Sequence, residues 1–318
     1  MGATPRTRTS QRPKSLAAGR PPTARKPKSL SRKATKRLIN THHQLEKRRQ
    51  QALALSDTKT AAHLEAEIES LGGLSKYQQA SLQGQRRDRG GDSSRVLMQW
   101  LGVGESRTGV PKAPPAYLLE SPLRMLEVGA LSPDNACSAS GCFQMERIDL
   151  NSQGPGILQQ DFLQRPLPQS DAERFDVISL SLVLNYVPQQ NYRGDMLLRC
   201  LDFLHEPGRV STVVTTTATS GPASAIVEDA DIGRLFPSVF MVLPEACVTN
   251  SRYLTEEKLT RMMNALGFDL LESKLSQRLV YYLWKRKRPR PSSIPSFSKK
   301  ELRSGTTRNN FSIVLQGT

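Results

Sequence analysis

The sequence predicts an α/β protein with a doubly wound, mainly parallel sheet. Short apolar runs recur between residues 123 and 184, and each ends in a polar turn, as buried parallel strands do. Gly129 follows the first run, and Asp149 ends the second. A glycine at one strand end lets a ligand approach the backbone, and a carboxylate at the next can bind a ribose diol. This pattern predicts a nucleoside site at the carboxyl edge of the sheet.

The glycine spacing indicates which kind of nucleoside ligand fits. Dinucleotide-binding folds carry G-x-G-x-x-G, because their pyrophosphate lies on a helix N-terminus. Here Leu131 and Asp134 occupy the second and third glycine positions. A single glycine preceded by Glu127 suits a cofactor without phosphates, such as S-adenosyl-L-methionine. An NAD-dependent enzyme is therefore disfavoured.

Two later strand ends offer further site groups. Asp161 and Phe162 follow a third short run, and they supply a carboxylate and a ring suited to an adenine amino group and ring face. The apolar run 175–184 leads into Asn185 and Tyr186. This is an altered form of the polar-Pro-Pro-aromatic clamp that ends the fourth strand of many adenine methyltransferases. A generic α/β core with a turn after each strand is the alternative explanation.

Several motifs between residues 72 and 284 extend beyond a general cofactor fold. They include Gly72-Gly73-Leu74, Arg89-Gly90-Gly91-Asp92, Leu126-Glu127-Val128-Gly129, Ile148-Asp149-Leu150, Gln160-Asp161-Phe162, Leu184-Asn185-Tyr186-Val187-Pro188, Arg193-Gly194-Asp195 and Cys247-Val248-Thr249-Asn250. Together they resemble the fungal 25S rRNA adenine-N(1) methyltransferase family. The resemblance implies a Rossmann-like, seven-stranded class I methyltransferase sheet, with an N-terminal helical extension and disordered basic tails. It also implies a nucleolar enzyme that methylates one adenine at N1 in large-subunit rRNA.

The resemblance assigns cofactor contacts to positions that match Gly129 and Asp149. We add Glu127, Asp161 and Phe162 to the expected S-adenosyl-L-methionine site. Animal relatives of this family are known as S-adenosylmethionine sensors. A binding module without catalysis, acting through a protein partner, is therefore the alternative function.

Asn185 and Tyr186 are the candidate catalytic residues. Tyr186 would stack on the target adenine, and Asn185 would hydrogen-bond its Watson–Crick edge. Adenine N1 carries a lone pair and no proton at neutral pH, so the transfer needs positioning more than a strong base. We expect no metal site, because the four Cys and four His lack the spacing of a zinc site.

Charge is concentrated at the start of the 318-residue chain. Residues 1–50 carry fifteen Lys or Arg and one acidic residue, which gives this segment a net charge of +14. The net charge of the whole chain is +16. Such a Pro-, Ser- and Thr-rich segment predicts a disordered arm that binds rRNA phosphates or directs nuclear import. We expect a nuclear and nucleolar monomer. No apolar run is long enough to predict a membrane span.

The chain divides into four expected regions. These are a disordered basic arm (1–50), a helical lead-in and linker (51–117), a methyltransferase domain (118–284) and a basic C-terminal tail (285–318). Periodicity and caps predict helices over 31–71, 77–83, 95–101, 196–204 and 255–266, a fifth strand over 238–243, and an antiparallel strand pair over 268–275 and 279–284. We expect Asp176 and Trp100 to be structural.

Two segments stand apart from this pattern. Arg86, Arg87 and Arg89 lie beside two glycines and suit either a phosphate contact or a solvated loop. Residues 210–234 are rich in Thr, Ser and Ala, and a Gly-Arg dipeptide occurs on both sides of the segment. It is either a surface-loop insertion, which costs little closure entropy, or a translated, unspliced intron. Sequencing the messenger RNA would distinguish the two.

Overall fold

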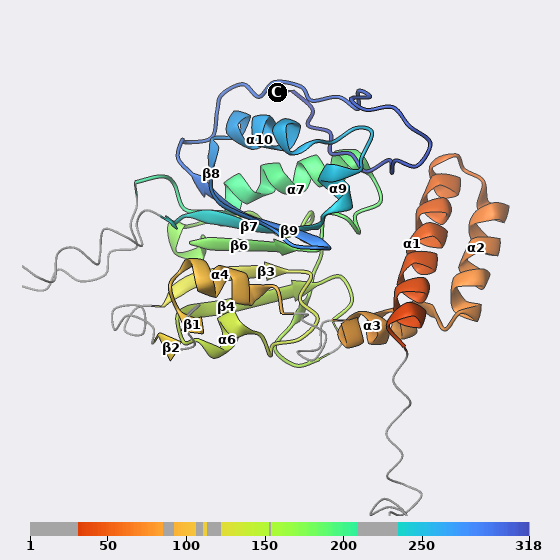
Figure 1. Ribbon diagram of the computed structural model, residues 1–318, viewed down its shortest axis with the longest axis horizontal. Helices are drawn as coiled ribbons and strands as arrows, with labels where there is room; N and C mark the ends of the chain where they lie inside the picture. Colours follow the sequence, from red (N-terminus) through yellow and green to blue (C-terminus); the bar gives the residue numbers. More distant parts are fainter. Residues whose placement is uncertain are drawn as a thin grey trace, which may run out of the picture.

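The computed structural model describes residues 31–84, 92–105, 111–112, 122–152, 154–208 and 235–317. Its centre is a seven-stranded sheet with the order β5-β4-β3-β6-β7-β9-β8 (Figure 1). The strands are β3 (Leu123–Val128), β4 (Phe143–Asp149), β5 (Leu158–Gln159), β6 (Val177–Ser181), β7 (Ser238–Pro244), β8 (Phe268–Leu275) and β9 (Leu279–Arg286). β9 runs antiparallel to both its neighbours, and all other pairs are parallel. This topology confirms the predicted Rossmann-like class I methyltransferase sheet.

The strand order reverses at β3. From β3 the chain moves outward to β4 and β5, and it then returns to β6 on the other side of β3, where Leu126 pairs with Ile178. Ligands of open α/β sheets bind outside the carboxyl ends of the strands at such a reversal. A ligand site is therefore expected outside the ends of β3, β4 and β6.

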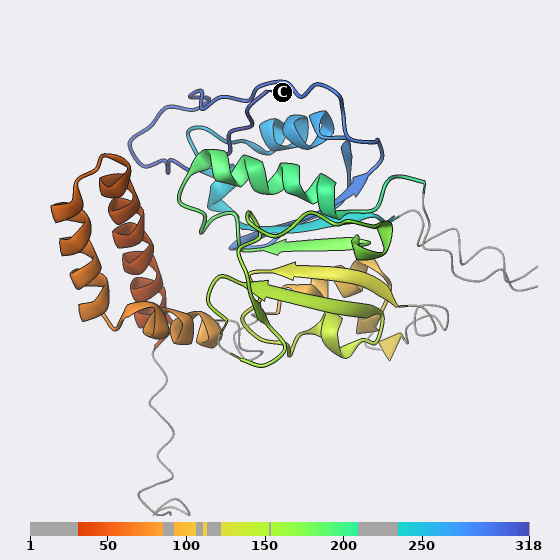
Figure 2. The ribbon, with the colours of Figure 1, turned by 180° about the vertical axis from the view of Figure 1, so that it is seen from behind.

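Helices cover both faces of the sheet (Figures 1 and 2). One face carries α7 (Gln190–Phe203), α9 (Ala246–Thr249) and α10 (Glu256–Ala265), and the other carries α4 (Ser94–Trp100) and α6 (Ala136–Ala139). Side chains alternate along β7, so that Val239 and Met241 join the first layer while Phe240 and Val242 join the second. The partly buried Trp100 packs on Phe240 with 6.0 Å between ring centroids, so its structural role is confirmed.

Most predicted elements are present, with shifted ends. Thr255 caps α10, and the antiparallel β8–β9 pair follows as predicted. α4 is preceded by Asp92, whose Oδ1 accepts a hydrogen bond from the Ser94 backbone N–H at 3.1 Å. α7 begins at Gln190 rather than at Met196, because its polar first turn lacks the apolar periodicity on which the prediction depended.

Three helices form an extension beside the sheet, namely α1 (Arg32–Ala54), α2 (Thr58–Ser70) and α3 (Gly73–Gly84). Leu45 of α1 packs with Leu64 and Ile68 of α2 in a small core of their own. The helices predicted over 31–71 are present as α1 and α2, so the disorder expected over 1–50 is wrong for residues 32–50. Burial against α2 stabilises α1, and the basic composition of this stretch hid that contact. Residues 1–30 lie outside the described part of the chain.

The C-terminal segment, residues 287–317, packs back onto the domain instead of forming a tail (Figure 1). Ile294, Ile313 and Leu315 are buried in the main core. The segment passes so close to α7 that a Cβ on Gly194 would lie 1.9 Å from the Val314 carbonyl oxygen. The prediction of a tail was wrong because the few apolar residues that anchor this segment are widely spaced and show no period.

The first two basic residues of the expected tail, Lys285 and Arg286, belong to β9 and are buried, whereas Lys287, Arg288 and Arg290 are exposed. Arg286 ends β9 with its side chain fully buried. Its guanidinium donates to the carbonyl oxygens of Leu201 and Leu204 at 3.0 Å and to the Glu206 carboxylate at 2.7 Å. These contacts remove Arg286 from any RNA-binding or import patch.

β6 ends before the predicted limit at Leu184. Leu182 has a φ of +58°, which turns the chain out of the strand, and the Tyr186 N–H donates to the Val183 carbonyl at 2.8 Å. The structural role of Asp176 is confirmed, since its buried carboxylate accepts from the Arg124 N–H at 2.8 Å.

Short elements also lie outside the main sheet and its helices. The expected linker contains an antiparallel pair, β1 (Gly104–Glu105) with β2 (Pro111–Lys112), and a 3-10 turn spans Asp171–Glu173. The Arg86, Arg87 and Arg89 cluster and most of the linker lie outside the described residues, as does the 210–234 segment. The helices that the structure describes include none with the length and apolarity to cross a membrane.

Candidate active site

Gly129 turns the chain at the end of β3. Its φ is +75°, in the region that favours glycine, and its N–H donates to the Ile148 carbonyl of β4 at 2.8 Å. A Cβ at this position would lie 2.6 Å from Cγ2 of Val183, in the turn after β6. Glycine is therefore required both by the backbone conformation and by the close approach of this turn.

Glu127 lies one residue before the end of β3, with its side chain 18% exposed. Asn135, which caps α6, donates its side-chain N–H to the carboxylate at 2.9 Å, and Arg147 Nε lies 3.9 Å away. Burial raises the pKa of Glu127 to about 7 in spite of these partners. The carboxylate is thus poised between its two protonation states, and a nearby cation would favour the charged one.

Asp149 ends β4 and is partly buried, which raises the pKa of its carboxyl group. Its Oδ1 accepts from the Asn151 N–H at 2.8 Å, and no described residue donates to Oδ2. Gln78 of α3 exchanges two hydrogen bonds with Asn151, at 2.7 and 3.0 Å. The helical extension is therefore attached to the loop that shapes the Asp149 carboxylate.

Asp161 and Phe162 follow β5, as predicted, but they differ in exposure. The Asp161 carboxylate accepts from the Leu163 N–H at 2.8 Å and remains partly exposed. The Phe162 ring is only 3% exposed and packs on Phe203 of α7, with 5.5 Å between ring centroids. Phe162 is a core residue here, so the expectation that its ring faces an adenine gains no support.

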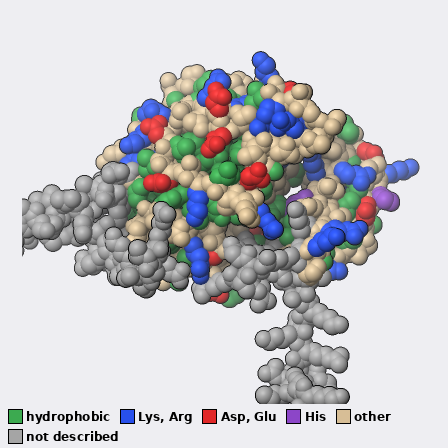
Figure 3. All heavy atoms as spheres, viewed as in Figure 1, with side chains coloured by type: hydrophobic (Ala, Val, Ile, Leu, Met, Phe, Trp, Pro, Cys, Tyr) green, Lys and Arg blue, Asp and Glu red, His purple; other side chains and the backbone are tan. Residues whose placement is uncertain are grey.

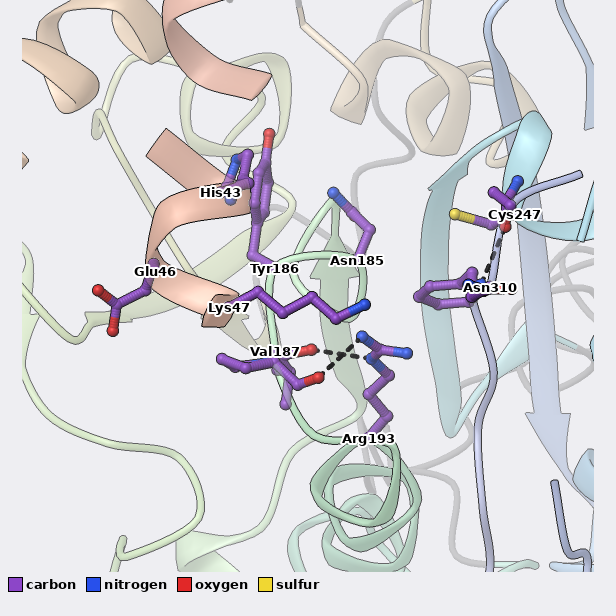
Figure 4. A pocket seen from close by; sticks show the side chains of 12 residues that line it. His43, Glu46, Lys47, Asn185, Tyr186, Val187, Arg193, Cys247 and Asn310 are labelled. Atoms are coloured by element: carbon purple, nitrogen blue, oxygen red, sulfur yellow. Dashed lines mark hydrogen bonds between the residues drawn. The ribbon is translucent and has the colours of Figure 1, made fainter. Parts of the chain in front are cut away.

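Asn185 and Tyr186 lie together on the turn after β6 (Figure 4). The Oδ1 of Asn185 is buried and accepts no hydrogen bond from the described residues. Tyr186 is 38% exposed. Burial of its hydroxyl raises the pKa of Tyr186, although hydrogen bonds with Tyr77 and Asn185 lower it in part. An unpaired amide oxygen beside an accessible ring suits recognition of a base.

Aromatic residues of the helical extension meet this turn, and sequence analysis missed them. His43 of α1 lies against Tyr186 with 4.3 Å between ring centroids, and His42 stacks on Tyr77 of α3 at 4.5 Å. Burial, followed by the neighbouring His42, lowers the pKa of His43 to about 4, so its imidazole is neutral at physiological pH. Nothing in the sequence indicated this contact, because α1 is distant in the chain from the motifs that flank Tyr186.

A pocket of about 280 Å³ opens between α1, the turn after β6, the start of α7 and the C-terminal segment (Figure 4). It is lined by His43, Glu46, Lys47, Asn185, Tyr186, Val187, Pro188, Arg193, Cys247, Asn309, Asn310 and Phe311. In Figure 3, Lys and Arg side chains gather around the hollow between the sheet domain and the helical extension. The two candidate catalytic residues therefore line a pocket that is closed partly by α1 and the C-terminal segment, both of which fall in regions expected to be disordered.

Comparisons of the sequence with known proteins indicate one family. The model of the family described as 25S rRNA (adenine(2142)-N(1))-methyltransferase, Bmt2, matches residues 62–313. The 25S rRNA adenine-N(1) methyltransferase of Schizosaccharomyces pombe is 36% identical over 278 residues, which cover 87% of this chain and 90% of that protein. The 25S rRNA (adenine(2142)-N(1))-methyltransferase of Saccharomyces cerevisiae is 36% identical over 253 residues, covering 78% of this chain and 62% of that protein.

Among solved structures, the N-methyltransferase NodS from Bradyrhizobium japonicum, in complex with S-adenosyl-L-homocysteine, aligns with 54% of this chain and 81% of its own. The identity is 13% and the TM-score 0.31. The family match is much broader, since it runs from α2 to the C-terminal segment that closes the pocket. This chain therefore belongs to the 25S rRNA (adenine(2142)-N(1))-methyltransferase family.

Proposed function

We propose that this protein transfers a methyl group from S-adenosyl-L-methionine to N1 of an adenine in large-subunit rRNA. The observation that carries the proposal is the meeting of Gly129 and Asp149, at the switch point of a methyltransferase sheet, in a chain of this family. Both curated relatives are named as methyltransferases, so the sensor alternative gains no support.

The residues at the carboxyl edge fit this cofactor. Gly129 presents backbone without a side chain, and Asp149 keeps one carboxylate oxygen free among the described residues for a ribose hydroxyl. Glu127 supplies a carboxylate for a cationic ligand, and Asp161 one for an adenine amino group. When bound, the cofactor supplies an electrophilic methyl group on a sulfonium.

On the acceptor side, Tyr186 stacks on the target adenine, and Asn185 hydrogen-bonds its Watson–Crick edge. The unpaired Asn185 oxygen and the accessible Tyr186 ring support these roles. The attacking N1 lone pair needs no base, so the neutral His43 supports the Tyr186 ring by packing. The adenine must leave its helix, which costs a few kcal/mol unless it is already unpaired.

We further propose that the protein acts as a monomer in the nucleolus. Residues 1–30, outside the described part, carry eight Lys or Arg and no acidic residue, which suits nuclear import. A fluorescent fusion, with and without these residues, would test the location. Light scattering would test the oligomeric state.

The deciding experiment is transfer of labelled methyl from S-adenosyl-L-methionine to large-subunit rRNA from a strain lacking this gene. The parent chain should place label on a single adenine as N1-methyladenosine, and Asp149→Ala should abolish this incorporation. Binding of the cofactor without incorporation would overturn the proposed reaction and favour a sensor. Incorporation at another atom or base would overturn the assigned specificity.

A further inference from the structure

The pocket beside Asn185 and Tyr186 contains positive charge that its own residues do not neutralise. Figure 4 shows the Lys47 ammonium pointing toward the Arg193 guanidinium across the pocket. Glu46 is the only acidic residue among the lining residues that the structure describes. Its carboxylate is bound to Arg49 and Gln50, each at 2.9 Å, and points away from the pocket.

Arg193 is held in place by neutral groups alone. Its guanidinium donates to the carbonyl oxygens of Val187 at 2.9 Å, Ser312 at 2.6 Å and Pro188 at 3.3 Å. The carbon at the centre of the guanidinium lies 4.4 Å from the centroid of the Phe311 ring. These contacts fix the position of the charge without an anionic partner, and they join the turn after β6 to the C-terminal segment.

Lys47, unlike Arg193, has no partner in the described part of the chain that holds its charged group in place. No hydrogen bond or ion pair joins its ammonium to the described residues, and its pKa is lowered by burial and then by the charges of Arg193 and Lys299. Bringing like charges together costs free energy unless an anion lies between them. Such an arrangement is therefore unfavourable in the free protein and favourable once an anion has bound.

We propose that Lys47 and Arg193 form a phosphate subsite that holds the RNA backbone next to the adenine in the pocket. This inference rests on the proposed function, because it adds a contact with an RNA phosphate to the contact that Asn185 and Tyr186 make with the adenine. The pocket, at about 280 Å³, is just below the usual range for small-ligand sites, which begins at about 300 Å³, so it suits no more than a single nucleotide. α1 lies outside the residues 62–313 that match the family model, so the Lys47 contact adds a substrate-binding role for this helix.

A matched pair of charge-removing variants tests the subsite. Lys47→Gln removes the pocket charge, while Arg48→Gln removes the neighbouring charge on the exposed surface of α1, outside the pocket lining. Lys47→Arg keeps the charge. The assay is steady-state transfer to the unmethylated rRNA, at several salt concentrations, with adenosine and adenosine 5′-monophosphate as competitors.

Lys47→Gln should raise KM for rRNA about tenfold, leaving KM for the cofactor unchanged, as expected for loss of one charged hydrogen bond. The slope of log KM against log salt should fall by about 0.7, the value for one single-stranded phosphate. Lys47→Gln should also lose the parent's preference for adenosine 5′-monophosphate over adenosine as a competitor against rRNA. Lys47→Arg should restore most of the affinity, and Arg48→Gln should change KM by less than about threefold.

The outcomes separate the two proposals. If the parent transfers methyl to rRNA but Lys47→Gln and Arg48→Gln behave alike, the phosphate subsite is overturned and the proposed function stands. If the parent neither binds nor methylates rRNA, the proposed function fails and the subsite fails with it. A Lys47→Gln variant that changes only the KM for the cofactor would also overturn the subsite, because Lys47 would then belong to the cofactor site.

Discussion

The two walls of the proposed active site differ in origin and in charge. The cofactor wall comes from the ends of neighbouring strands, β3 and β4, and carries the carboxylates of Glu127 and Asp149. The acceptor wall combines α1 near one end of the described chain, the C-terminal segment at the other and the start of α7. It carries Lys47 and Arg193. A negative wall suits a sulfonium cofactor, and a positive wall suits an RNA phosphate. Local motifs can produce the first wall, whereas long-range packing must produce the second.

The largest expected effect is a loss of stability when the C-terminal segment, which forms part of the acceptor wall, loses an apolar anchor. Ile313→Ala removes a fully buried side chain and should lower the free energy of unfolding by about 3 kcal/mol. Leu302→Ala, at a position 44% exposed in the same segment, should change it by less than about 1 kcal/mol. Denaturant unfolding of both variants measures this difference. Equal stabilities would mean that the segment is a tail after all.

On the cofactor wall, Asp149→Asn keeps the shape of the side chain and removes its charge. We expect kcat/KM for S-adenosyl-L-methionine to fall about 100-fold, the equivalent of one strong charged hydrogen bond. RNA affinity should stay unchanged, since the two walls act separately. Asp134→Asn, an exposed carboxylate after β3, is the control and should be neutral. A loss of RNA binding in Asp149→Asn would break the separation of the walls.

On the acceptor wall, Asn185→Ala should lower kcat about 20-fold, because the adenine edge loses its hydrogen-bond partner. Cofactor affinity, measured by calorimetry, should not change. Gln189→Ala serves as the control, because this side chain makes no capping hydrogen bond at the start of α7. A raised KM for the cofactor with unchanged kcat would assign Asn185 to the other wall.

The smallest effect concerns the pH dependence of the cofactor wall. The pKa of Glu127 is raised to about 7, so this carboxyl group is protonated in more than half of the molecules below neutral pH. A cationic cofactor favours the carboxylate and releases the proton, so its affinity should rise about fourfold between pH 6.5 and pH 8. The ratio of parent to Glu127→Gln affinity, measured across this range, isolates the contribution of this carboxyl group. A ratio independent of pH would show that Glu127 does not face the cofactor.

Much of the cofactor wall could be predicted because its signals are local. The run before Gly129, the carboxylate of Asp149 and the rule that parallel strand ends share one edge were enough. Phe162 shows the limit, since its position after β5 was correct but its burial against Phe203 could not be known. Burial depends on what packs above a residue, which its neighbours in the chain do not encode.

Two basic stretches show the same limit for charge. Arg286 looked like the start of a basic tail, yet it lies buried and paired with Glu206, whereas Lys47 looked like part of a disordered arm, yet it points into the pocket. Composition counts charges but cannot tell which of them meet a partner. The contact between the rings of His43 and Tyr186 was missed in the same way, because composition does not show which residues pack together.

The sequence by itself determined the fold class, the strand ends that meet at the carboxyl edge and the family, because hydrophobic periodicity and turn residues act over short distances. Only the tertiary structure decided that α1 and the C-terminal segment close a pocket over Asn185 and Tyr186, and that Lys47 and Arg193 face each other there. Contacts between residues so far apart in the chain arise from the packing of whole elements. No local pattern carries that information.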